Sequence, residues 1–408
     1  MSDFLNNLEG RSSDQRDQDI AMALPQQIAL AQARATGLSD HLKGVSPRGI
    51  LSAADLAKLP VLRKSDIGQA QSKNPPFGGF TTKPANKFRH VFQSPGPIYE
   101  PGEISDDWWR MARFLNACGV TENDIVQNCF SYHMTPAGMI FESGAHAIGA
   151  TVFPAGTGQT ELQVRAARAL GVTAYAGTPD YLKTILDRAD EMGVDLSGIT
   201  KAGVGGGALF PSLRQEYADR GIRCLQCYAT ADVGNIAYES SAMEGMIVDE
   251  GVVIEIVTPG TGNPVVEGDV GEVLVTTLNT DYPLIRFATG DMSAVLPGQS
   301  PCGRTNMRIK GWMGRADQTT KIKGMFVRPE QVAALVAKND SITKARVIVS
   351  RENESDIMTV QVESEKQGSQ DIEASVLETM KMRGTVIVMK PGSLPNDGKV
   401  IEDQRSYE

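Results

Sequence analysis

The chain has 408 residues, of which 41% are hydrophobic and 22% charged, and its formal net charge is -9. This length fits one large unit with a smaller one, or two to three domains, and the composition is ordinary for a water-soluble globular protein. The acidic balance without a Lys/Arg cluster excludes a typical nucleic-acid-binding protein, and the lack of about 18 consecutive apolar residues excludes a typical membrane span.

The N-terminus and the cysteines indicate the compartment. The first residues, MSDFLNNLEG, lack the basic start and apolar core of a signal peptide, so we expect a cytoplasmic protein. Five scattered cysteines are typical of free thiols rather than of a disulfide framework. Cys224 and Cys227 form a C-x-x-C pattern in the apolar run RCLQCYA, where buried strand positions are a better interpretation than a metal or redox site.

From about residue 105 to 230, apolar strand-like runs alternate with helical stretches. The runs are DIVQNCF, TVFPAG, TAYAG, KAGVGGG and CLQCYA, with helices predicted near 139–150, 161–170, 180–192 and 212–220. This alternation predicts βαβ units and a largely parallel sheet with helices on its faces. Ligands of such sheets bind at the carboxyl ends of the strands.

The pattern of apolar residues changes after residue 232. The short β runs IVDEGVVIEIV, GEVLVTTL and PLIRFATGDMSAV predict a smaller antiparallel β subdomain. From about 318, the strands ARVIVS, MTVQVES and TVIVMKPG with a helix near 371–382 predict an α+β segment. Its length of about ninety residues suffices for a separately folded lid.

Several motifs occur in a fixed order along almost the whole chain. DLAKLPVLRKSDI and PPFGGF come first, followed by GGGALFPSLR (205–214), YATADVG (228–234), PLIRFATGD (283–291), GRADQTTKIKGMFVRPEQV (314–332) and LPNDGK (394–399). Together these segments resemble the adenylate-forming superfamily, and specifically its phenylacetate-CoA ligase branch.

The resemblance implies both a fold and an activity. The fold is α/β, with a large N-terminal domain (1–316) of mostly parallel sheets and a small β subdomain, and a smaller mobile α+β C-terminal lid domain (317–408). The activity is that of an AMP-forming acid-CoA ligase, which activates an aryl or arylacetic acid through an acyl-adenylate. ATP or AMP, Mg²⁺ and coenzyme A are the implied cofactors, and a homodimer is plausible.

The resemblance also implies a nucleotide site. Asp291 lies where the family has the carboxylate that accepts hydrogen bonds from the ribose hydroxyls, and Tyr228 lies where an aromatic ring stacks on adenine. The other implied nucleotide-binding residues are Gly205, Gly206, Gly207, Ala229, Thr230 and Arg315. Asp232 occupies the position of the family's magnesium-binding Glu, although its side chain is one methylene shorter.

The C-terminal motifs carry the remaining implied roles. Lys399 resembles the lysine that stabilises charge during adenylation, although an exposed tail lysine is the alternative. Asp317 resembles the hinge residue about which the lid turns. Lys323 and Gly324 lie in the KIKG segment that contacts coenzyme A in the family, and a solvated basic strand edge is as good an interpretation of Lys323 and the neighbouring Lys321. The implied acid pocket takes Tyr132, His133 and Ala231, with a structural role as the alternative for His133.

Three motifs depart from the family: Ala231 stands where the Tyr228 motif has Thr or Ser, Gly207 stands where the glycine turn has Glu, and the phosphate loop differs most. The family's phosphate loop is rich in Ser, Thr and Gly and usually carries a Lys, because donors must surround the phosphates while a cation neutralises them. This chain has QSPGPIYEP at 93–101, which keeps only Ser94 and Gly96, loses amide donors at three prolines and adds Glu100. We therefore expect a weakened grip on pyrophosphate and a changed first half-reaction.

Two alternatives to the ligase stay open at this stage. An adenylating enzyme could pass the acyl group to an acceptor other than coenzyme A. A degenerate member of the family could bind a nucleotide or acyl conjugate without ATP-dependent activity. The presence of Asp291, Asp317 and Lys399 counts against this alternative, because a binding module needs neither a hinge nor a mobile lysine.

Overall fold

The computed structural model describes residues 4–94, 97–105, 107–207, 209–316, 320–322, 325–352, 355–365, 370–395 and 399–405. The chain divides into two compact units. The first unit comprises residues 1–255, 274–289 and 295–311, and the second comprises 256–273, 290–294 and 312–408. The domain boundary predicted after residue 316 stays a prediction. No helix in the described ranges is long and apolar enough to cross a membrane.

A parallel sheet forms the centre of the first unit, as the alternating pattern predicts. Its strands are β4 (Ile125–Asn128), β5 (Thr151–Phe153), β6 (Ala174–Gly177), β7 (Lys201–Val204) and β8 (Arg223–Thr230). They lie in the order β5-β4-β6-β7-β8, and every neighbouring pair is parallel. The connecting helices are α5 (Ala137–Ile148), α6 (Thr160–Leu170), α7 (Pro179–Met192) and α8 (Pro211–Asp219).

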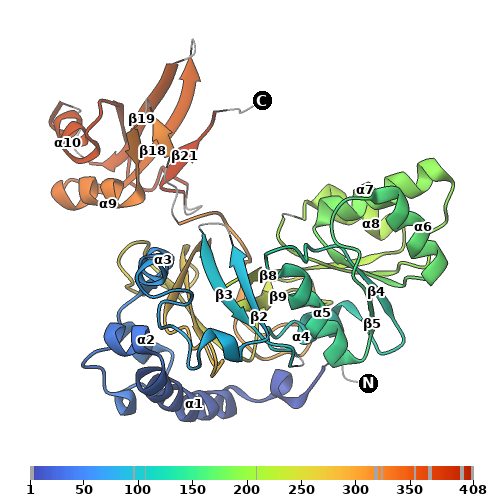
Figure 1. The fold of residues 1–408 in the computed structure, drawn as a ribbon. Coiled ribbons are helices and arrows are strands. Elements are labelled where there is room, and N and C mark those ends of the chain that lie inside the picture. Colours follow the sequence, from blue (N-terminus) through green and yellow to red (C-terminus); the bar gives the residue numbers. More distant parts are fainter. Residues whose placement is uncertain are drawn as a thin grey trace. The chain divides into compact units, whose positions relative to one another are not determined.

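Helices cover both faces of this sheet (Figure 1) because successive strand residues point to opposite sides. Ala174 and Ala176 pack with residues of α4 (Ala112–Cys118) and α5, whereas Tyr175 packs with residues of α6, α7 and α8. On β8, Cys227 belongs to the first of these cores and Cys224 to the second. The C-x-x-C pair is therefore split between two cores, which supports its interpretation as buried strand residues.

Part of the β-rich stretch after residue 232 continues the large sheet. Strands β9 (Gly234–Tyr238), β10 (Met246–Val248), β15 (Arg308–Ile309) and β14 (Val295–Leu296) extend it beyond β8 in the order β8-β9-β10-β15-β14, with antiparallel pairing. A separate sheet has the order β1-β13-β12-β11, formed by Leu62–Arg63, Phe287–Ser293, Gly271–Thr277 and Val252–Val257. The small β subdomain expected from sequence is thus divided between two sheets.

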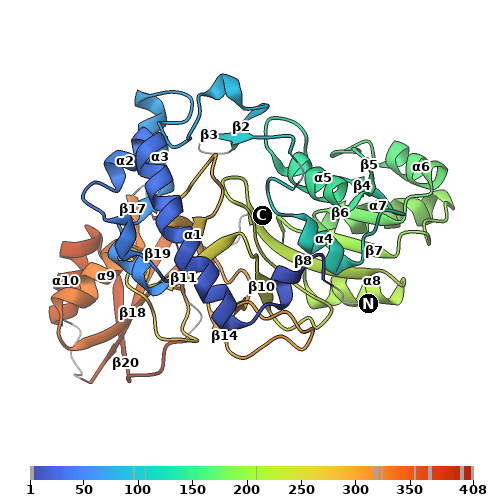
Figure 2. The same cartoon turned by 90° about the horizontal axis from the view of Figure 1, so that it is seen from below.

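The N-terminal segment is helical. After η1 (Asn7–Gly10) come α1 (Ser13–Arg34) and α2 (Thr36–His41), the dark-blue segment of Figure 2. Ser12 caps α1 by accepting a hydrogen bond from the Gln15 amide. The remaining elements before the sheet are η2 (Pro47–Gly49), η3 (Ala54–Lys58), α3 (Lys64–Lys73) and η4 (Ala85–Lys87).

The PPFGGF segment forms a close backbone contact with α2. The amide of Gly37 donates a hydrogen bond to the carbonyl oxygen of Gly79 at 2.9 Å. A Cβ atom on Gly37 would lie 2.6 Å from the carbonyl oxygen of Gly78, so only glycine fits at this position.

Residues in register with the family's phosphate loop form a β-hairpin. Strand β2 (His90–Ser94) pairs antiparallel with β3 (Ile98–Gly102), and Ser94 lies opposite Ile98. Gln71 of α3 holds β3 in place, because its side-chain amide forms two hydrogen bonds with the backbone of Tyr99 at 2.8 and 2.9 Å. Over its described residues, the segment is therefore a β-hairpin that Gln71 attaches to α3.

The second unit contains the predicted α+β pattern. Its strands include β16 (Thr320–Ile322), β17 (Met325–Val327), β18 (Ile342–Glu352), β19 (Ser355–Ser364), β20 (Thr385–Met389) and β21 (Ile401–Asp403). The last four form a sheet in the order β20-β19-β18-β21. Helices α9 (Pro329–Lys338) and α10 (Gln370–Met380) accompany this sheet in Figure 1.

Candidate active site

The predicted adenine-binding residues of the first unit lie on neighbouring strands. Gly205–Gly207 follow β7, and β7 pairs in parallel with β8, which carries the Tyr228 motif. The side-chain amide of Gln226 donates a hydrogen bond to the carbonyl oxygen of Gly207 at 2.9 Å. A Cβ atom on Gly205 would lie 2.9 Å from the sulfur of Cys227. The fold thus brings the glycine turn and the Tyr228 segment together at the carboxyl edge of the sheet.

Tyr228 is buried, and its hydroxyl donates a hydrogen bond to Thr289 Oγ1 at 3.1 Å. The pairing of β8 with β9 shifts register between Tyr228 and Ala229. Beyond this irregularity, Thr230 Oγ1 accepts a hydrogen bond from the Val233 amide at 3.1 Å, which closes the turn that carries Ala231 and Asp232. The bulge therefore re-aims the end of β8, as bulges beside functional sites do.

The predicted acid-pocket residues Tyr132 and His133 follow β4. The Tyr132 hydroxyl donates to Glu142 Oε2 at 2.7 Å and accepts from the Asn128 side-chain amide at 2.8 Å. A Cβ atom on Gly138 would lie 2.8 Å from the Tyr132 ring, so the ring rests against the start of α5. His133 is exposed. The Tyr132 phenol is thus already hydrogen-bonded on both sides and offers an external ligand mainly its ring.

Asp232, the predicted magnesium ligand, is buried beside a lysine that sequence reasoning did not select. The Lys64 ammonium donates to Asp232 Oδ2 at 3.0 Å, whereas Asp232 Oδ1 has no hydrogen-bond partner among the described residues. Lys64 belongs to DLAKLPVLRKSDI, which is one of the segments that resemble the family. This motif marks the segment of Lys64 in the sequence, but only the fold brings Lys64 into contact with Asp232.

The hairpin that replaces the phosphate loop carries a buried carboxyl group. The Ser94 hydroxyl donates a hydrogen bond to Glu100 Oε1 across the two strands. Burial and, secondarily, the charge of Asp232 raise the pKa of Glu100 to about 8. At neutral pH Glu100 is therefore mostly a neutral acid, so it brings less negative charge to this region than its residue type suggests.

The predicted ribose-binding residues lie in the second unit. Asp291 is on β13, and its Oδ1 accepts hydrogen bonds from Arg315 at 3.0 Å and from the Trp312 indole nitrogen at 3.1 Å. The backbones of Asp291 and Arg315 also form an isolated antiparallel bridge. The structure thus brings this predicted pair together and adds Trp312, which no motif had indicated.

The other predicted residues of the C-terminal motifs are less fully described. Lys399 is exposed just before β21 and lowers the pKa of Glu402, together with other groups. Four predicted residues lie outside the described residues, namely Gly96, Asp317, Lys323 and Gly324. Their predicted roles in phosphate binding, hinge motion and coenzyme A binding stay predictions.

Comparison with known proteins decides the family. Residues 103–280 match the family model described as AMP-binding enzyme. The chain is 30% identical over 337 residues to the phenylacetate-coenzyme A ligase of Aromatoleum evansii, covering 79% of this chain and 75% of that one. It is 28% identical over 350 residues to the phenylacetate-coenzyme A ligase of Thermus thermophilus, covering 82% and 78%. This chain belongs to the phenylacetate-CoA ligase branch of the adenylate-forming enzymes.

Membership of this ligase branch confirms the resemblance that the motifs indicated, and the protein is an enzyme of that class. Solved structures agree on the fold. A crystal structure of 2-hydroxyisobutyryl-CoA ligase in complex with 2-HIB-AMP and CoA has a TM-score of 0.72, with 22% identity and coverage of 95% of this chain and 91% of that chain. The predicted α/β fold class is confirmed.

The ligase branch implies a magnesium ion, and the residues present fit one. The open Oδ1 atom of the buried Asp232 is a hard oxygen donor, which suits Mg²⁺, and Lys64 holds the other oxygen in place. No group of three or more His, Cys, Asp or Glu residues that could hold a metal occurs in the described part of the chain. A magnesium ion held at Asp232 would therefore need further oxygen ligands from substrate or water.

Proposed function

We propose that the protein is an AMP-forming ligase that activates an aryl or arylacetic acid as an acyl-adenylate and transfers the acyl group to coenzyme A. One observation carries the proposal. The glycine turn after β7 and the Tyr228 segment of β8 lie on paired parallel strands at the carboxyl edge of the sheet, where nucleotides bind in such folds. The names of the curated relatives supply the class of substrate.

In the proposed nucleotide site, the Tyr228 ring packs against adenine and Gly205–Gly207 present backbone groups to it. The carboxylate of Asp291 accepts hydrogen bonds from the ribose hydroxyls. Its contacts with Arg315 and Trp312 keep the carboxylate oriented for this task. Ala229 is small enough to leave the adenine face open.

In the first proposed step, an oxygen of the substrate carboxylate attacks the α-phosphorus of ATP and pyrophosphate leaves. Lys399 stabilises the negative charge that develops on the carboxylate and the α-phosphate. A magnesium ion at Asp232 supplies charge neutralisation for the phosphates when bound. In the second step, the thiol of coenzyme A attacks the acyl carbon and AMP leaves, with Asp317 as the hinge and Lys323 and Gly324 beside the thiol arm.

The proposed acid pocket uses the segment after β4. Tyr132 offers its ring, because its hydroxyl is hydrogen-bonded to Asn128 and Glu142. Ala231 replaces a hydroxyl residue of the family motif and leaves room for an apolar group. His133 is exposed and is assigned the edge of the pocket. The acid itself is expected to be aromatic, and a homodimer in the cytoplasm is the expected state.

A second candidate function is favoured by the hairpin that replaces the phosphate loop. Glu100 and three prolines occupy the segment that grips triphosphate in relatives. This favours an enzyme that handles AMP, a preformed acyl-adenylate or an acyl conjugate, with weak ATP-dependent adenylation. An acceptor other than coenzyme A is a variant of the same candidate.

The first prediction is that ATP with Mg²⁺ binds the protein and that one acid from a panel of aryl acids drives pyrophosphate release. Calorimetric titration with AMP and with ATP plus Mg²⁺, followed by a pyrophosphate assay, measures both. Binding of AMP without binding or reaction of ATP would instead support the second candidate. Adding hydroxylamine or coenzyme A to the assay then identifies the acceptor from the product.

A further inference from the structure

The turn between β8 and β9, residues 231–233, is held by residues that precede α4. The Asn235 amide donates a hydrogen bond to the Trp109 carbonyl oxygen at 2.9 Å, and the side-chain amide of Asn235 donates to the Arg110 carbonyl oxygen at 3.1 Å. A Cβ atom on Gly234 would lie 2.7 Å from the same Trp109 oxygen. The two segments are thus in direct backbone contact, although 125 positions separate Arg110 from Asn235. We name residues 231–233 the β8–β9 turn.

The Arg110 side chain also bonds to the backbone of this turn. Its Nη2 atom donates hydrogen bonds to the carbonyl oxygens of Val233 and Asn235, the latter at 3.2 Å. A Cβ atom on Gly251 would lie 2.3 Å from Arg110 Cδ, so glycine at this position leaves the room that the side chain needs. One nitrogen atom therefore ties the end of the β8–β9 turn to the start of β9.

A buried carboxylate holds the guanidinium in this position. Asp249 is fully buried, its Oδ1 lies 3.5 Å from Arg110 Nε, and its Oδ2 accepts a hydrogen bond from Arg113 at 3.0 Å. The Gly251 amide donates to Asp249 Oδ1 at 2.8 Å, which fixes the carboxylate. Because Asp249 supplies the counter-charge, Arg110 can keep its charge away from water while it bonds to the turn.

The backbone of Arg110 has an uncommon conformation. Its φ is 63°, in the left-handed region that few residues other than glycine adopt. The Arg110 amide donates to the Asp107 carbonyl oxygen at 2.8 Å and so closes the turn before α4. Strained backbones persist where surrounding contacts require them, and they cluster at functional sites. The contacts of Arg110 with Val233 and Asn235 indicate which site this conformation serves.

The β8–β9 turn carries two predicted site residues, Ala231 and Asp232. Lys64 holds the Asp232 side chain through Oδ2 at 3.0 Å, whereas Arg110 bonds to Val233, the residue that directly follows Asp232. The side chain and the backbone of Asp232 are therefore held by different partners. Precise placement of this kind matters for chemistry, because a displacement of about 1 Å can cost a hundred-fold in rate.

We propose that Arg110 is a positioning residue, whose guanidinium fixes the backbone of the β8–β9 turn and so keeps Ala231 and Asp232 in place. It acts through the turn and not by contact with substrate. The consequence for catalysis rests on the proposed function, but the hold of Arg110 on the turn does not.

Hydrogen–deuterium exchange of the full chain without ligand tests the hold on the turn. Arg110→Lys keeps a positive charge beside Asp249, but the shorter ammonium side chain cannot bond to both carbonyl oxygens. Amides of residues 230–235 should exchange at least ten-fold faster in this variant than in the wild type. Arg113→Lys is the matched control and should exchange like the wild type there, because the hydrogen bonds described for the Arg113 side chain go to Asp249.

An unchanged exchange rate in Arg110→Lys overturns the proposal, and so does equal acceleration in both lysine variants. Asn235→Ala removes only the side-chain bond to the Arg110 carbonyl oxygen and should speed exchange by a smaller factor. It also tests the contact if Arg110→Lys does not fold, and an unchanged rate in Asn235→Ala then overturns the proposal.

Pyrophosphate release provides the second readout. In Arg110→Lys, kcat should fall at least five-fold and the Mg²⁺ concentration for half-maximal rate should rise at least five-fold. Metal-free AMP affinity should stay within two-fold, because Tyr228 and Gly205–Gly207 lie outside the β8–β9 turn. Arg113→Lys should resemble the wild type in all three, and equal losses in both variants would show a general structural effect and overturn the proposal. A wild type without pyrophosphate release would count against the proposed function alone, since exchange still decides the role of Arg110.

Discussion

At the scale of single residues, burial changes what a side chain can do more than its type suggests. Glu100 reads as a negative charge in the sequence, but burial raises its pKa to about 8. Cys302 shows the opposite change, since hydrogen bonds from Ser240, Ser300 and Arg304 outweigh its partial burial and lower the pKa of its thiol. The chemistry at both positions therefore follows from burial and hydrogen bonds that the fold supplies.

Asp107 allows a pH-dependent prediction at this scale. Its Oδ1 accepts a hydrogen bond from the Ala112 amide at 2.8 Å before α4, and its pKa is raised from 3.8 to about 6, chiefly by burial. Because the folded pKa lies above the unfolded value, ionisation destabilises the fold. The cost is absent below about pH 4, grows up to about pH 6 and is constant above it.

Asp107→Asn keeps an oxygen acceptor without the charge. We expect it to be more stable than the wild type by roughly 2–3 kcal/mol at pH 8, at 1.36 kcal/mol per pKa unit, and to lose this advantage at pH 4. Urea unfolding of both proteins at the two pH values measures the difference. An equal difference at both pH values would show that the charge of Asp107 is not the cause.

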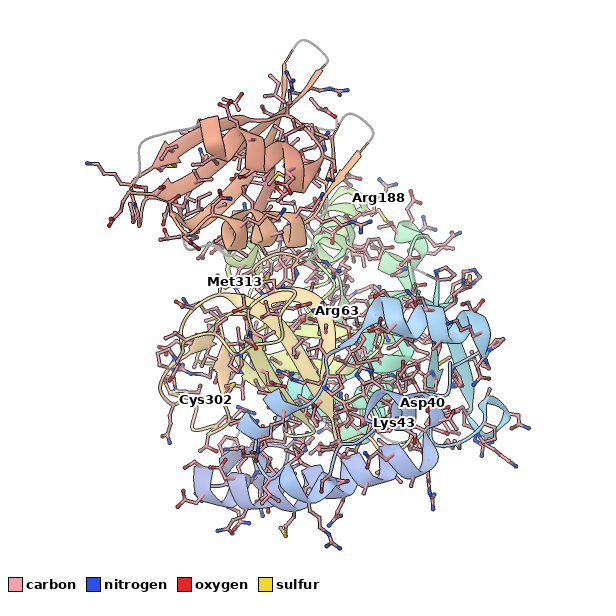
Figure 3. All side chains as sticks on the ribbon, turned by 90° about the vertical axis from the view of Figure 1, so that its left-hand side faces the viewer. Asp40, Lys43, Arg63, Arg188, Cys302 and Met313 are labelled. Atoms are coloured by element: carbon pink, nitrogen blue, oxygen red, sulfur yellow. The ribbon has the colours of Figure 1, made fainter. Side chains whose placement is uncertain are left out.

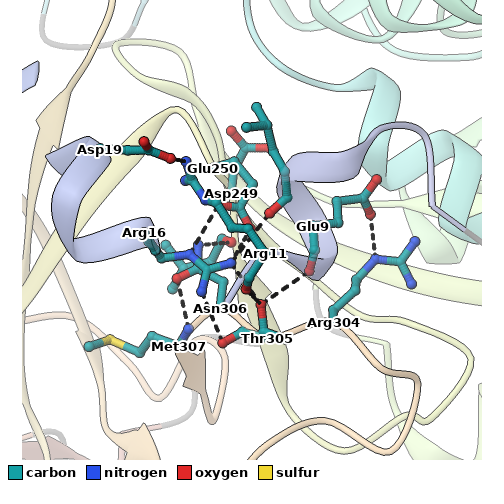
Figure 4. Close-up of polar contacts among 12 residues, drawn as sticks. Glu9, Arg11, Arg16, Asp19, Asp249, Glu250, Arg304, Thr305, Asn306 and Met307 are labelled. Carbon is teal, nitrogen blue, oxygen red and sulfur yellow. Dashed lines mark hydrogen bonds and ion pairs between the residues drawn. The ribbon is translucent and has the colours of Figure 1, made fainter. Parts of the chain in front are cut away.

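At the scale of elements, buried ion pairs and hydrogen bonds fix the N-terminal segment to the turn of residues 302–305 and to Glu250, as Figure 4 shows. Arg304 Nε donates to Glu9 Oε2, and both side chains are 1% exposed. The Thr305 amide donates to the Glu9 carbonyl oxygen at 3.0 Å, and Arg16 pairs with Glu250 at 3.0 Å. These contacts give the turn a structural role.

Glu9→Gln should destabilise the protein by about 3 kcal/mol, because it removes the buried charge that pairs with the buried Arg304. Denaturant unfolding measures this loss. Glu378→Gln is the matched control, since Glu378 forms an exposed pair with Lys338, and it should change stability little. Equal effects of the two substitutions would contradict the role of burial.

At the scale of the whole chain, the fold divides the five cysteines into two groups that differ in burial and in thiol pKa. Cys118, Cys129, Cys224 and Cys227 are buried, and burial raises the pKa of each thiol. Cys302 is partly exposed in a loop, labelled in Figure 3, and the pKa of its thiol is lowered. A thiol reacts as the thiolate and only where the reagent reaches it.

We therefore expect one thiol, that of Cys302, to react quickly with a thiol reagent such as DTNB in the native protein. All five thiols should react in denaturant, because all five are free. Cys302→Ser should remove the fast phase and leave the others unchanged. A fast phase of two thiols, lost in Cys224→Ser, would contradict burial of the C-x-x-C pair.

The alternating part of the fold was predictable because it depends on short-range patterns. The helices predicted near 161–170 and 180–192 correspond to α6 (Thr160–Leu170) and α7 (Pro179–Met192). The membership of β9, β10, β14 and β15 in the large sheet was not predictable, because strand pairing depends on long-range contacts that no local pattern records.

The sequence by itself determined the family, the parallel α/β core and the order of the motifs, since these are written in local periodicity and in residues close together along the chain. Only the tertiary structure decided that Lys64 pairs with Asp232 and that Glu100 is buried and hydrogen-bonded to Ser94. The two partners Lys64 and Asp232 are 168 positions apart, and the burial of Asp232 and Glu100 arises from packing between segments that are distant in the sequence. Desolvation and charge coupling are properties of the space around a group, and the fold defines that space.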